Sequence, residues 1–374
     1  MAQRLAGHAT PEGTKRLADR TPGWPEDARR QAFGLTLSSV GLGTYLGDPG
    51  PAKDHGYHDA IVAALRGGIN VIDTAINYRE QRSERVVGAA VRALVRDALV
   101  ARDELFVSTK GGFVPGDADA ADPRQAIQDA YVATGLLTRE TFVAGCHCMS
   151  PAYLADQVRR SRDNLGLETL DLYYVHNPET QLGAGVAEDE FYGRLGEAFR
   201  QLERSKAAGH IARYGIATWD GLRTPPGEQG HLSLSRVIAA AKEAADAEGA
   251  PGVGLGAVQA PLNLAMPEAV TATTQRTAAG ATVPLAEALR ASGLAFFTSG
   301  SILQGRLARG IPRGAGDRIR MDGTPAQVAL QATRSAPGVT TALIGMSQVP
   351  HVDEALDLLL RVKTDASIWN GAAG

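Results

Sequence analysis

Short runs of β-branched and other apolar residues alternate along the chain with longer segments in which apolar residues recur with helical spacing. This alternation is typical of repeated strand–helix units built around a parallel sheet. Eight runs have the length of buried strands: 37–45, 70–75, 105–110, 170–176, 211–219, 255–263, 294–300 and 340–347. Amphipathic segments accompany them, and several end in a glycine directly before the next strand. The pattern predicts an α/β fold, a single-domain (β/α)₈ TIM barrel.

Two segments fall outside this alternation. Residues 1–33 form a polar extension rich in Pro and Gly, so we expect the barrel to occupy residues 34–374. Residues 113–150 make an unusually long loop between the third strand and its helix. Loops of this length in compact domains are usually functional or disordered, and the sequence alone does not choose between these roles.

Composition narrows the class of protein. With 374 residues, 44% of them hydrophobic and 21% charged, the chain can bury a large globular core. A net charge of −3 argues against nucleic acid or an anionic membrane as a partner. No apolar run is long enough to span a bilayer, and the N-terminal residues lack the apolar core of a signal peptide. Because two cysteines are too few for a disulfide framework, we expect a cytoplasmic protein.

Two small clusters of metal-ligating residue types were weighed and set aside. Cys146, His147 and Cys148 are adjacent, so they cannot easily point at one zinc ion together, and no fourth ligand motif accompanies them. His55 and His58 are expected just before the first helix, exposed to solvent. The sequence therefore predicts no metal site.

Polar side chains mark the carboxyl ends of three consecutive predicted strands. Asp73 ends the second strand, Lys110 the third and His176 the fourth, while Tyr78 stands in the loop after the second. Active sites of (β/α)₈ barrels are built at this end of the strands. We therefore expect all four side chains to face one cavity.

These four residue types together could move a proton. A tyrosine hydroxyl has an ordinary pKa near 10, so a cation such as Lys110 is needed to stabilise the phenolate. Asp73 can serve as the counter-ion of the lysine, and His176 can donate a hydrogen bond to a carbonyl oxygen. A reduction would also need an electron source, which a cofactor would have to supply.

Several motifs resemble those of the aldo-keto reductase superfamily: DTAINY (73–78), STK (108–110), SRDNLGLETLDLYYVHNPE (161–179) and GLGT (41–44). The resemblance runs from about residue 37 to residue 360. It implies an NAD(P)(H)-dependent oxidoreductase that transfers hydride between the nicotinamide and a small carbonyl or alcohol substrate, such as an aldehyde, ketone or sugar. It also implies Tyr78 as proton donor, Lys110 and Asp73 as tuners of its pKa, and His176 as the residue that orients the substrate.

The resemblance further implies a set of cofactor contacts. Gln259, four residues before Asn263, is expected to hold the nicotinamide carboxamide, and ALIGMSQVPHVDEAL (342–356) to bind the adenosine end. The complete expected set is Gly43, Thr44, Asp73, Thr218, Gln259, Ser299, Gly305, Arg306, Gly345, Met346, Ser347, His351 and Glu354. Tyr45 and Trp219 are expected to contact the substrate.

The resemblance makes NADP(H) the expected cofactor rather than NAD(H). Basic residues normally neutralise the 2′-phosphate of NADP. Here Met346 and His351 stand where relatives often carry Lys or Arg, and Ala355 replaces a common asparagine.

Two other functions stay open at this point. The same barrel could be a non-catalytic nicotinamide-binding sensor or regulatory subunit, which would bind NADPH without oxidising it. An unrelated barrel lyase or isomerase would bind no nicotinamide at all. Substrate identity, physiological direction and oligomeric state are not predicted.

Overall fold

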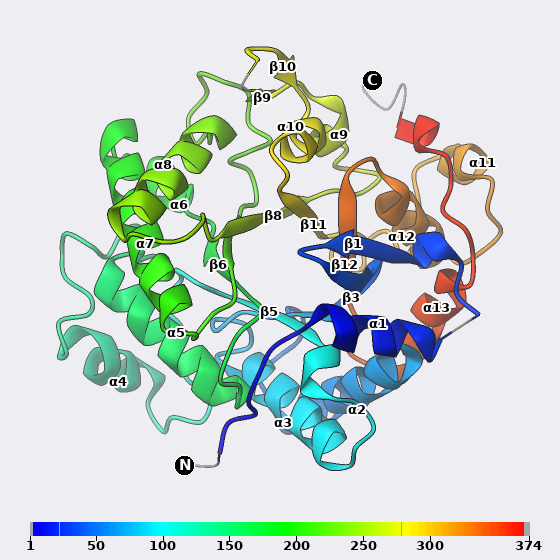
Figure 1. Ribbon diagram of the computed structural model, residues 1–374, viewed down its shortest axis with the longest axis horizontal. Coiled ribbons are helices and arrows are strands. Elements are labelled where there is room, and N and C mark those ends of the chain that lie inside the picture. Colours follow the sequence, from blue (N-terminus) through cyan, green and yellow to red (C-terminus); the bar gives the residue numbers. More distant parts are fainter. Residues whose placement is uncertain (1–2, 22, 278, 370–374) are drawn as a thin grey trace.

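Eight parallel strands form a closed barrel in the computed structural model, which describes residues 3–21, 23–277 and 279–369 (Figure 1). Their order around the barrel follows the chain, and the last strand pairs with the first. The strands are β3 (Val40–Gly43), β4 (Val71–Asp73), β5 (Phe106–Gly111), β6 (Leu172–His176), β7 (Tyr214–Ala217), β8 (Leu255–Pro261), β11 (Ala295–Ser299) and β12 (Val339–Gly345). Six of them lie within one predicted run, and β5 and β12 each extend one residue beyond theirs, so the predicted (β/α)₈ barrel is confirmed.

Helices surround the barrel on all sides in Figure 1. The longer ones are α2 (Pro51–Gly67), α3 (Arg82–Arg96), α5 (Pro151–Leu165), α7 (Glu188–Ala207), α8 (Leu234–Ala247), α10 (Leu285–Ala291), α12 (Pro325–Ser335) and α13 (Val349–Leu359). Short helices are α6 (Thr180–Gly183), α9 (Glu268–Thr271) and α11 (Ala315–Ile319), and β9 (Gln275–Arg276) pairs with β10 (Thr282–Val283). Within the described residues, no helix combines the length and apolar character that a membrane crossing requires.

The first barrel helix begins earlier than the sequence pattern indicated. We expected it to begin after His58, whereas α2 begins at Pro51, where the fixed φ of proline suits the first helical position. His55 and His58 therefore lie inside the helix rather than before it. The amphipathic pattern missed the first two turns because they carry few apolar residues.

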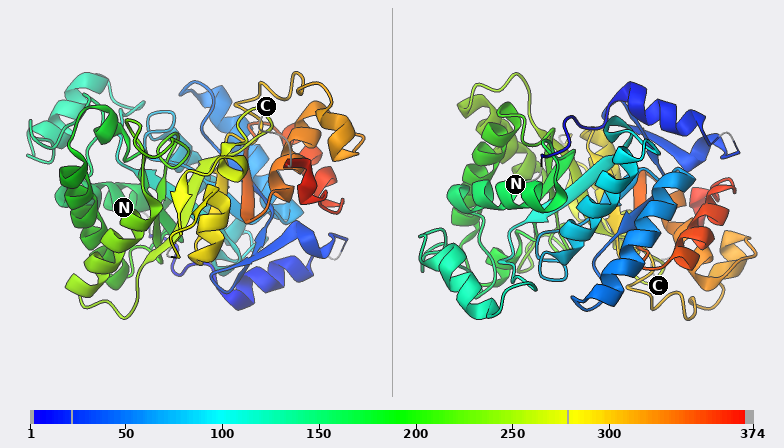
Figure 2. Two further views of the ribbon diagram at one scale, coloured as in Figure 1. Left: turned by 90° about the horizontal axis from the view of Figure 1, so that it is seen from above. Right: turned by 90° about the horizontal axis from the view of Figure 1, so that it is seen from below.

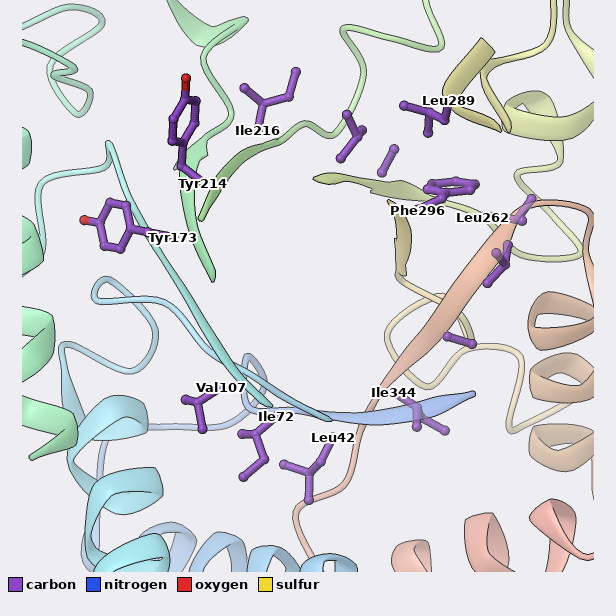
Figure 3. Packing of buried hydrophobic residues seen from close by; sticks show 14 of the residues in the cluster. Leu42, Ile72, Val107, Tyr173, Tyr214, Ile216, Leu262, Leu289, Phe296 and Ile344 are labelled. Atoms are coloured by element: carbon purple, nitrogen blue, oxygen red, sulfur yellow. The ribbon is translucent and has the colours of Figure 1, made fainter. Parts of the chain in front are cut away.

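Alternating residues of each strand face two different cores. Val71, Phe106 and Phe297 belong to a cluster inside the barrel, whereas Ile72 and Val107 belong to the larger cluster between barrel and helices. Figure 3 shows side chains of this outer cluster pointing from the strands toward the helices. The same alternation determines which polar side chains near the carboxyl ends of the strands face the inside of the barrel.

The N-terminal segment closes one end of the barrel. It contains α1 (Pro11–Asp19) and β1 (Arg29–Ala32), which forms an antiparallel hairpin with β2 (Leu35–Ser38). Phe33 and Gly34 turn the hairpin at φ 59° and 76°, values that suit a tight turn of this kind. The Phe33 ring stacks on Phe106, at the amino end of β5, with centroids 6.0 Å apart. Figure 2 shows this segment, in dark blue, at one end of the molecule.

The segment 113–150 carries secondary structure of its own. It includes α4 (Pro123–Ile127) and a π-helical turn at Gln128–Val132. Tyr131 and Leu137 pack with Cys148 and with Tyr153 of α5 in a small separate cluster. Two backbone hydrogen bonds, Val114 N to Cys146 O and Cys148 N to Gly112 O, join the two ends of the segment. This insertion is therefore fastened directly to the carboxyl end of β5.

Close packing of α3 on α5 gives a test of the fold. A Cβ added to Gly88 of α3 would lie 2.5 Å from the backbone oxygen of Leu165. Gly88→Ala should therefore lower the free energy of unfolding by about 1–3 kcal/mol, as overpacking does. Gly196 of α7 has open space around it, so Gly196→Ala should raise this free energy by about 0.5–1 kcal/mol. Urea unfolding of both variants checks the difference, and equal effects would contradict the packing.

Candidate active site

A cavity of about 580 Å³ opens at the carboxyl end of the barrel strands. Residues from most strand ends and from the loops after them form its wall, as the barrel architecture leads one to expect. The expected site residues that line it are Gly43, Thr44, Tyr45, Asp73, Tyr78, His176, Thr218, Trp219, Gln259, Ser299, Gly305, Gly345, Ser347, His351 and Glu354. The structure therefore brings together residues spread over most of the chain.

Three expected residues lie outside the cavity wall. Lys110 is fully buried beneath it. Met346, expected to contact the cofactor, is also fully buried and packs in the core between barrel and helices. Arg306, also expected to contact the cofactor, is exposed on the segment after β11, between cavity-lining Gly305 and buried Leu307.

A buried ion pair lies at the floor of the cavity. The Lys110 Nζ is 2.5 Å from Asp73 Oδ2 and donates a second hydrogen bond of 2.8 Å to the Thr74 carbonyl oxygen. The other carboxylate oxygen of Asp73 accepts from Ser108 Oγ at 2.8 Å and from Gln259 Nε2 at 3.0 Å. Both oxygens are thus paired, which offsets the cost of removing two charges from water.

Tyr78 lies beside this pair. The Lys110 Nζ is 4.8 Å from the centre of the Tyr78 ring. Burial raises the pKa of Tyr78 above its ordinary value, and the nearby Lys110 charge opposes this shift without cancelling it. Desolvation lowers the pKa of Lys110, but Asp73 and Tyr78 raise it by more, so the net shift of this pKa is upward. At neutral pH the site therefore holds a protonated tyrosine next to a charged lysine.

His176 faces Tyr78 from the next strand but one. The two rings meet edge to face with their centroids 5.8 Å apart. Burial, together with the charge of Lys110, lowers the pKa of His176 well below its usual range, so the ring is neutral. Its Nδ1 is buried without a hydrogen-bond partner among the described residues. A neutral imidazole carries one proton, and with that proton on Nε2 the ring can donate a hydrogen bond through this nitrogen.

The three residues after Tyr78 form a left-handed turn. Arg79, Glu80 and Gln81 have φ values of 49°, 53° and 72°, a conformation that costs energy for any residue with a Cβ. The Arg79 guanidinium pairs with Asp54 at 2.5 Å, and Gln81 Nε2 donates to the Gly116 oxygen at 2.8 Å. These contacts hold the turn, and with it the backbone that carries Tyr78.

Sequence reasoning missed part of the cavity wall. The missed side chains include Leu46, Tyr57, Asn77, Phe113, Asn177, Ser301, Ile302, Gln304 and Ala308. Asn77 directly precedes Tyr78, and Asn177 directly follows His176. Their positions in the two motifs could therefore have indicated that they line the cavity. Tyr57 reaches the wall from α2, and nothing in the local sequence indicated that contact.

The charge of the cavity wall is uneven. Among its described residues the ionisable ones are Asp73, Glu354, His176, His351 and tyrosines, with neither Lys nor Arg. Arginines instead occur on residues 301–323, a segment that contributes Ser301, Ile302, Gln304, Gly305 and Ala308 to the wall. No group of three or more metal-ligating side chains gathers in the described part of the chain.

A protonated tyrosine, a neutral histidine and a buried cation at one end of a cavity can act together on an oxygen atom. The tyrosine can donate a proton, the histidine a hydrogen bond, and the lysine can stabilise the phenolate that results. The arrangement fits a polarised C=O or C–OH group.

Comparisons with known proteins relate the chain to reductases. A model of the Aldo/keto reductase family matches residues 39–224. An NADH-specific methylglyoxal reductase from Escherichia coli is 28% identical over 191 residues, which is 50% of each chain. The 2,5-diketo-D-gluconic acid reductase B from a Corynebacterium species is 31% identical over 188 residues, 50% of this chain and 47% of that protein. The chain spans about half the length of these curated relatives.

Solved structures share the fold over most of the chain. A glycerol dehydrogenase from Gluconobacter oxydans has a TM-score of 0.64 and 19% identity, covering 93% of this chain and 94% of its own. An aldo/keto reductase from Klebsiella pneumoniae, in complex with NADP and acetate, has a TM-score of 0.58 and 19% identity over 91% of both chains. Identities this low show a common fold.

The left-handed turn gives a test of how the site is held. Glu80→Gly removes an unfavourable Cβ from the turn and should raise the free energy of unfolding by about 0.5–1 kcal/mol. Arg79→Gly relieves the same backbone but loses the ion pair with Asp54, so it should lower stability by about 2 kcal/mol. Urea unfolding measures both. A destabilised Glu80→Gly variant would contradict this account.

Proposed function

This chain belongs to the aldo/keto reductase family, and we propose that it is an NAD(P)(H)-dependent oxidoreductase acting on a small carbonyl or alcohol substrate. The observation that carries the proposal is the Asp73–Lys110 ion pair beneath Tyr78, with His176 facing the same space. The names of the two curated relatives, both reductases of carbonyl compounds, support it.

The residues around the cavity fit a nicotinamide dinucleotide. Its volume lies within the range of ligand pockets, and polar side chains occur on several sides of its wall. Gln259 uses its amide nitrogen on Asp73, which leaves its amide oxygen for the carboxamide. Ser347, His351 and Glu354 would take the adenosine end. When bound, the nicotinamide supplies or accepts the hydride.

Tyr78 would donate its proton to the carbonyl oxygen of the substrate. Burial keeps that proton on the tyrosine in the resting site, and Lys110 stabilises the phenolate once the proton has left. Asp73 holds the lysine in place and keeps it charged. The neutral His176 would donate a hydrogen bond to the same oxygen, which fixes the direction of the carbonyl.

The wall near Tyr78 favours an uncharged substrate. Tyr45, Phe113 and Trp219 provide aromatic surface, while Asn77 and Asn177 provide amides. With no lysine or arginine in the described wall, a carboxylate or phosphate on the substrate would lose its hydration without gaining a cation.

We place NADP(H) ahead of NAD(H) as the cofactor. Solved relatives include one in complex with NADP, although the Escherichia coli relative is named NADH-specific. Arginines on the segment 301–323 could neutralise a 2′-phosphate; among them Arg306 and Arg309 directly follow the wall residues Gly305 and Ala308 and are exposed.

Replacing Tyr78 tests the reaction. Tyr78→Phe should fold, bind NADPH within about twofold of the wild-type Kd, and lose at least about 100-fold in kcat, as loss of a general acid predicts. Tyr131→Phe is the matched control, because Tyr131 lies outside the cavity wall and its hydroxyl has no hydrogen-bond partner among the described residues. Steady-state oxidation of NADPH with aldehydes, ketones and sugars gives kcat. A fully active Tyr78→Phe would refute the mechanism, and wild-type binding without turnover would favour a sensor.

Replacing Arg306 tests the cofactor preference. Arg306→Ala should raise the Kd for NADPH about tenfold and leave the Kd for NADH nearly unchanged, because NADPH alone carries the 2′-phosphate. Arg290→Ala on α10 is the control, since that exposed arginine lies outside the cavity wall. Fluorescence titration measures both constants. NADH binding as tightly as NADPH to the wild type would overturn the preference.

A further inference from the structure

His147, in the inserted segment 113–150, contacts the backbone of His176 and is shielded from solvent. Its side chain is fully buried, and its Nε2 lies 2.8 Å from the carbonyl oxygen of His176. Backbone bridges join His147 to Phe113 and to Val143, so both ends of the insertion fix its position. Nothing in the reaction described above uses this residue.

The protonation state of His147 follows from its two neighbours. A carbonyl oxygen can only accept, so Nε2 carries the proton and donates it to His176. On the other side Nδ1 accepts from Gln181 Nε2 at 3.3 Å, and Gln181 Oε1 accepts from Arg194 at 3.2 Å. Burial lowers the pKa of His147 to about 4, so the ring is neutral and has one donor and one acceptor, as these contacts require.

The carbonyl that His147 holds belongs to an unusual peptide. It joins His176 to Asn177, and Asn177 has a φ of 44°, in the left-handed region that residues with a Cβ adopt at some cost. The Asn177 N–H donates to the Ala217 oxygen at 2.6 Å, while the His176 oxygen receives the proton of His147. One hydrogen bond on each side thus fixes the plane of this peptide.

The hydrogen bond between His147 and the His176 oxygen is tightly packed against Phe113 and Gly112. The Phe113 ring meets the rings of His147 and His176 edge to face, with centroids 5.4 Å and 5.1 Å away. A Cβ on Gly112 would lie 2.9 Å from both His147 Nε2 and the His176 oxygen. Any side chain at this glycine would therefore push the two atoms apart.

We propose that His147 is a positioning residue: its hydrogen bond to the His176 carbonyl fixes the His176–Asn177 peptide and so directs both side chains into the cavity. Through this hydrogen bond the inserted segment 113–150 contributes to the active site, although His147 itself does not contact the substrate. The expected effect on turnover rests on the function proposed above, whereas the expected effect on the orientation of His176 and Asn177 does not.

Two substitutions at His147 separate the hydrogen bond from the packing. His147→Phe keeps a ring against Phe113 but removes the donor, and His147→Gln restores a donor of similar reach. In His147→Phe, kcat should fall about 10–100-fold, as expected when a polarising group is misdirected, with the Kd for NADPH changed less than about twofold. His147→Gln should recover kcat to within about threefold of the wild type.

A readout independent of turnover accompanies the kinetics. In NMR spectra the Asn177 backbone amide and the His176 ring signals should shift in His147→Phe and return toward their wild-type positions in His147→Gln. Gly112→Ala should shift the same signals, because its Cβ presses on the same hydrogen bond. Tyr131→Phe, in the same insertion but outside the cavity wall, is the control and should leave kcat and these signals unchanged.

The outcomes distinguish this proposal from the proposed function. A His147→Phe variant that keeps kcat within about twofold of an active wild type, with unmoved His176 and Asn177 signals, would overturn the proposal. If the wild type turns over no carbonyl substrate, the proposed function fails, and the NMR signals alone then test whether His147 positions His176 and Asn177. Signals that shift in His147→Phe and return in His147→Gln support the positioning role, and signals that stay in place overturn it.

Discussion

The buried ion pair between Lys110 and Asp73 is the interaction on which the arrangement of the site depends. Two opposite charges removed from water cost several kcal/mol each unless geometry and further hydrogen bonds compensate. Here the compensation comes from three parts of the barrel: Ser108 on β5 and Gln259 on β8 donate to the carboxylate, and the Thr74 carbonyl, directly after β4, accepts from the ammonium. Their register must therefore be correct before the pair is stable. The burial that keeps water from this pair also raises the pKa of Tyr78, so one local environment sets the charge of both groups.

Two strained backbone segments flank this centre, and each is held by a polar contact from a distant part of the chain. The turn at 79–81 depends on the ion pair of Arg79 with Asp54 from α2, and the peptide after His176 depends on His147 from the insertion. Tyr78, directly before the first segment, and His176 and Asn177, at the second, line the cavity. Strain of this kind persists only where surrounding structure determines it, which is common at functional sites.

Sequence reasoning succeeded where one-dimensional periodicity determines the three-dimensional position. The eight apolar runs predicted the eight barrel strands. Asp73 and His176 end β4 and β6, and Lys110 is one residue before the end of β5, so the three side chains lie at the carboxyl ends of consecutive strands as expected. The prediction failed where the position of a side chain depends on contacts with residues that are distant in the sequence. Met346 follows Gly345, yet its side chain packs among the helices rather than in the cavity. The hydrogen bond of His147 was not predicted, because its partner is a backbone oxygen that no sequence motif can indicate.

The hairpin that closes the opposite end of the barrel has a consequence for the order of folding. Phe33 stacks on Phe106, and Phe106 in turn stacks on Phe297, so the interior of the barrel joins residues from the two ends of the chain. The first barrel strand likewise pairs with the last. Contacts between residues so far apart in sequence form slowly, and during synthesis the early strands must wait for the later ones with an apolar face and an unpaired edge exposed. Barrel closure is thus a late event, which leaves the chain vulnerable to aggregation until its final third has been made.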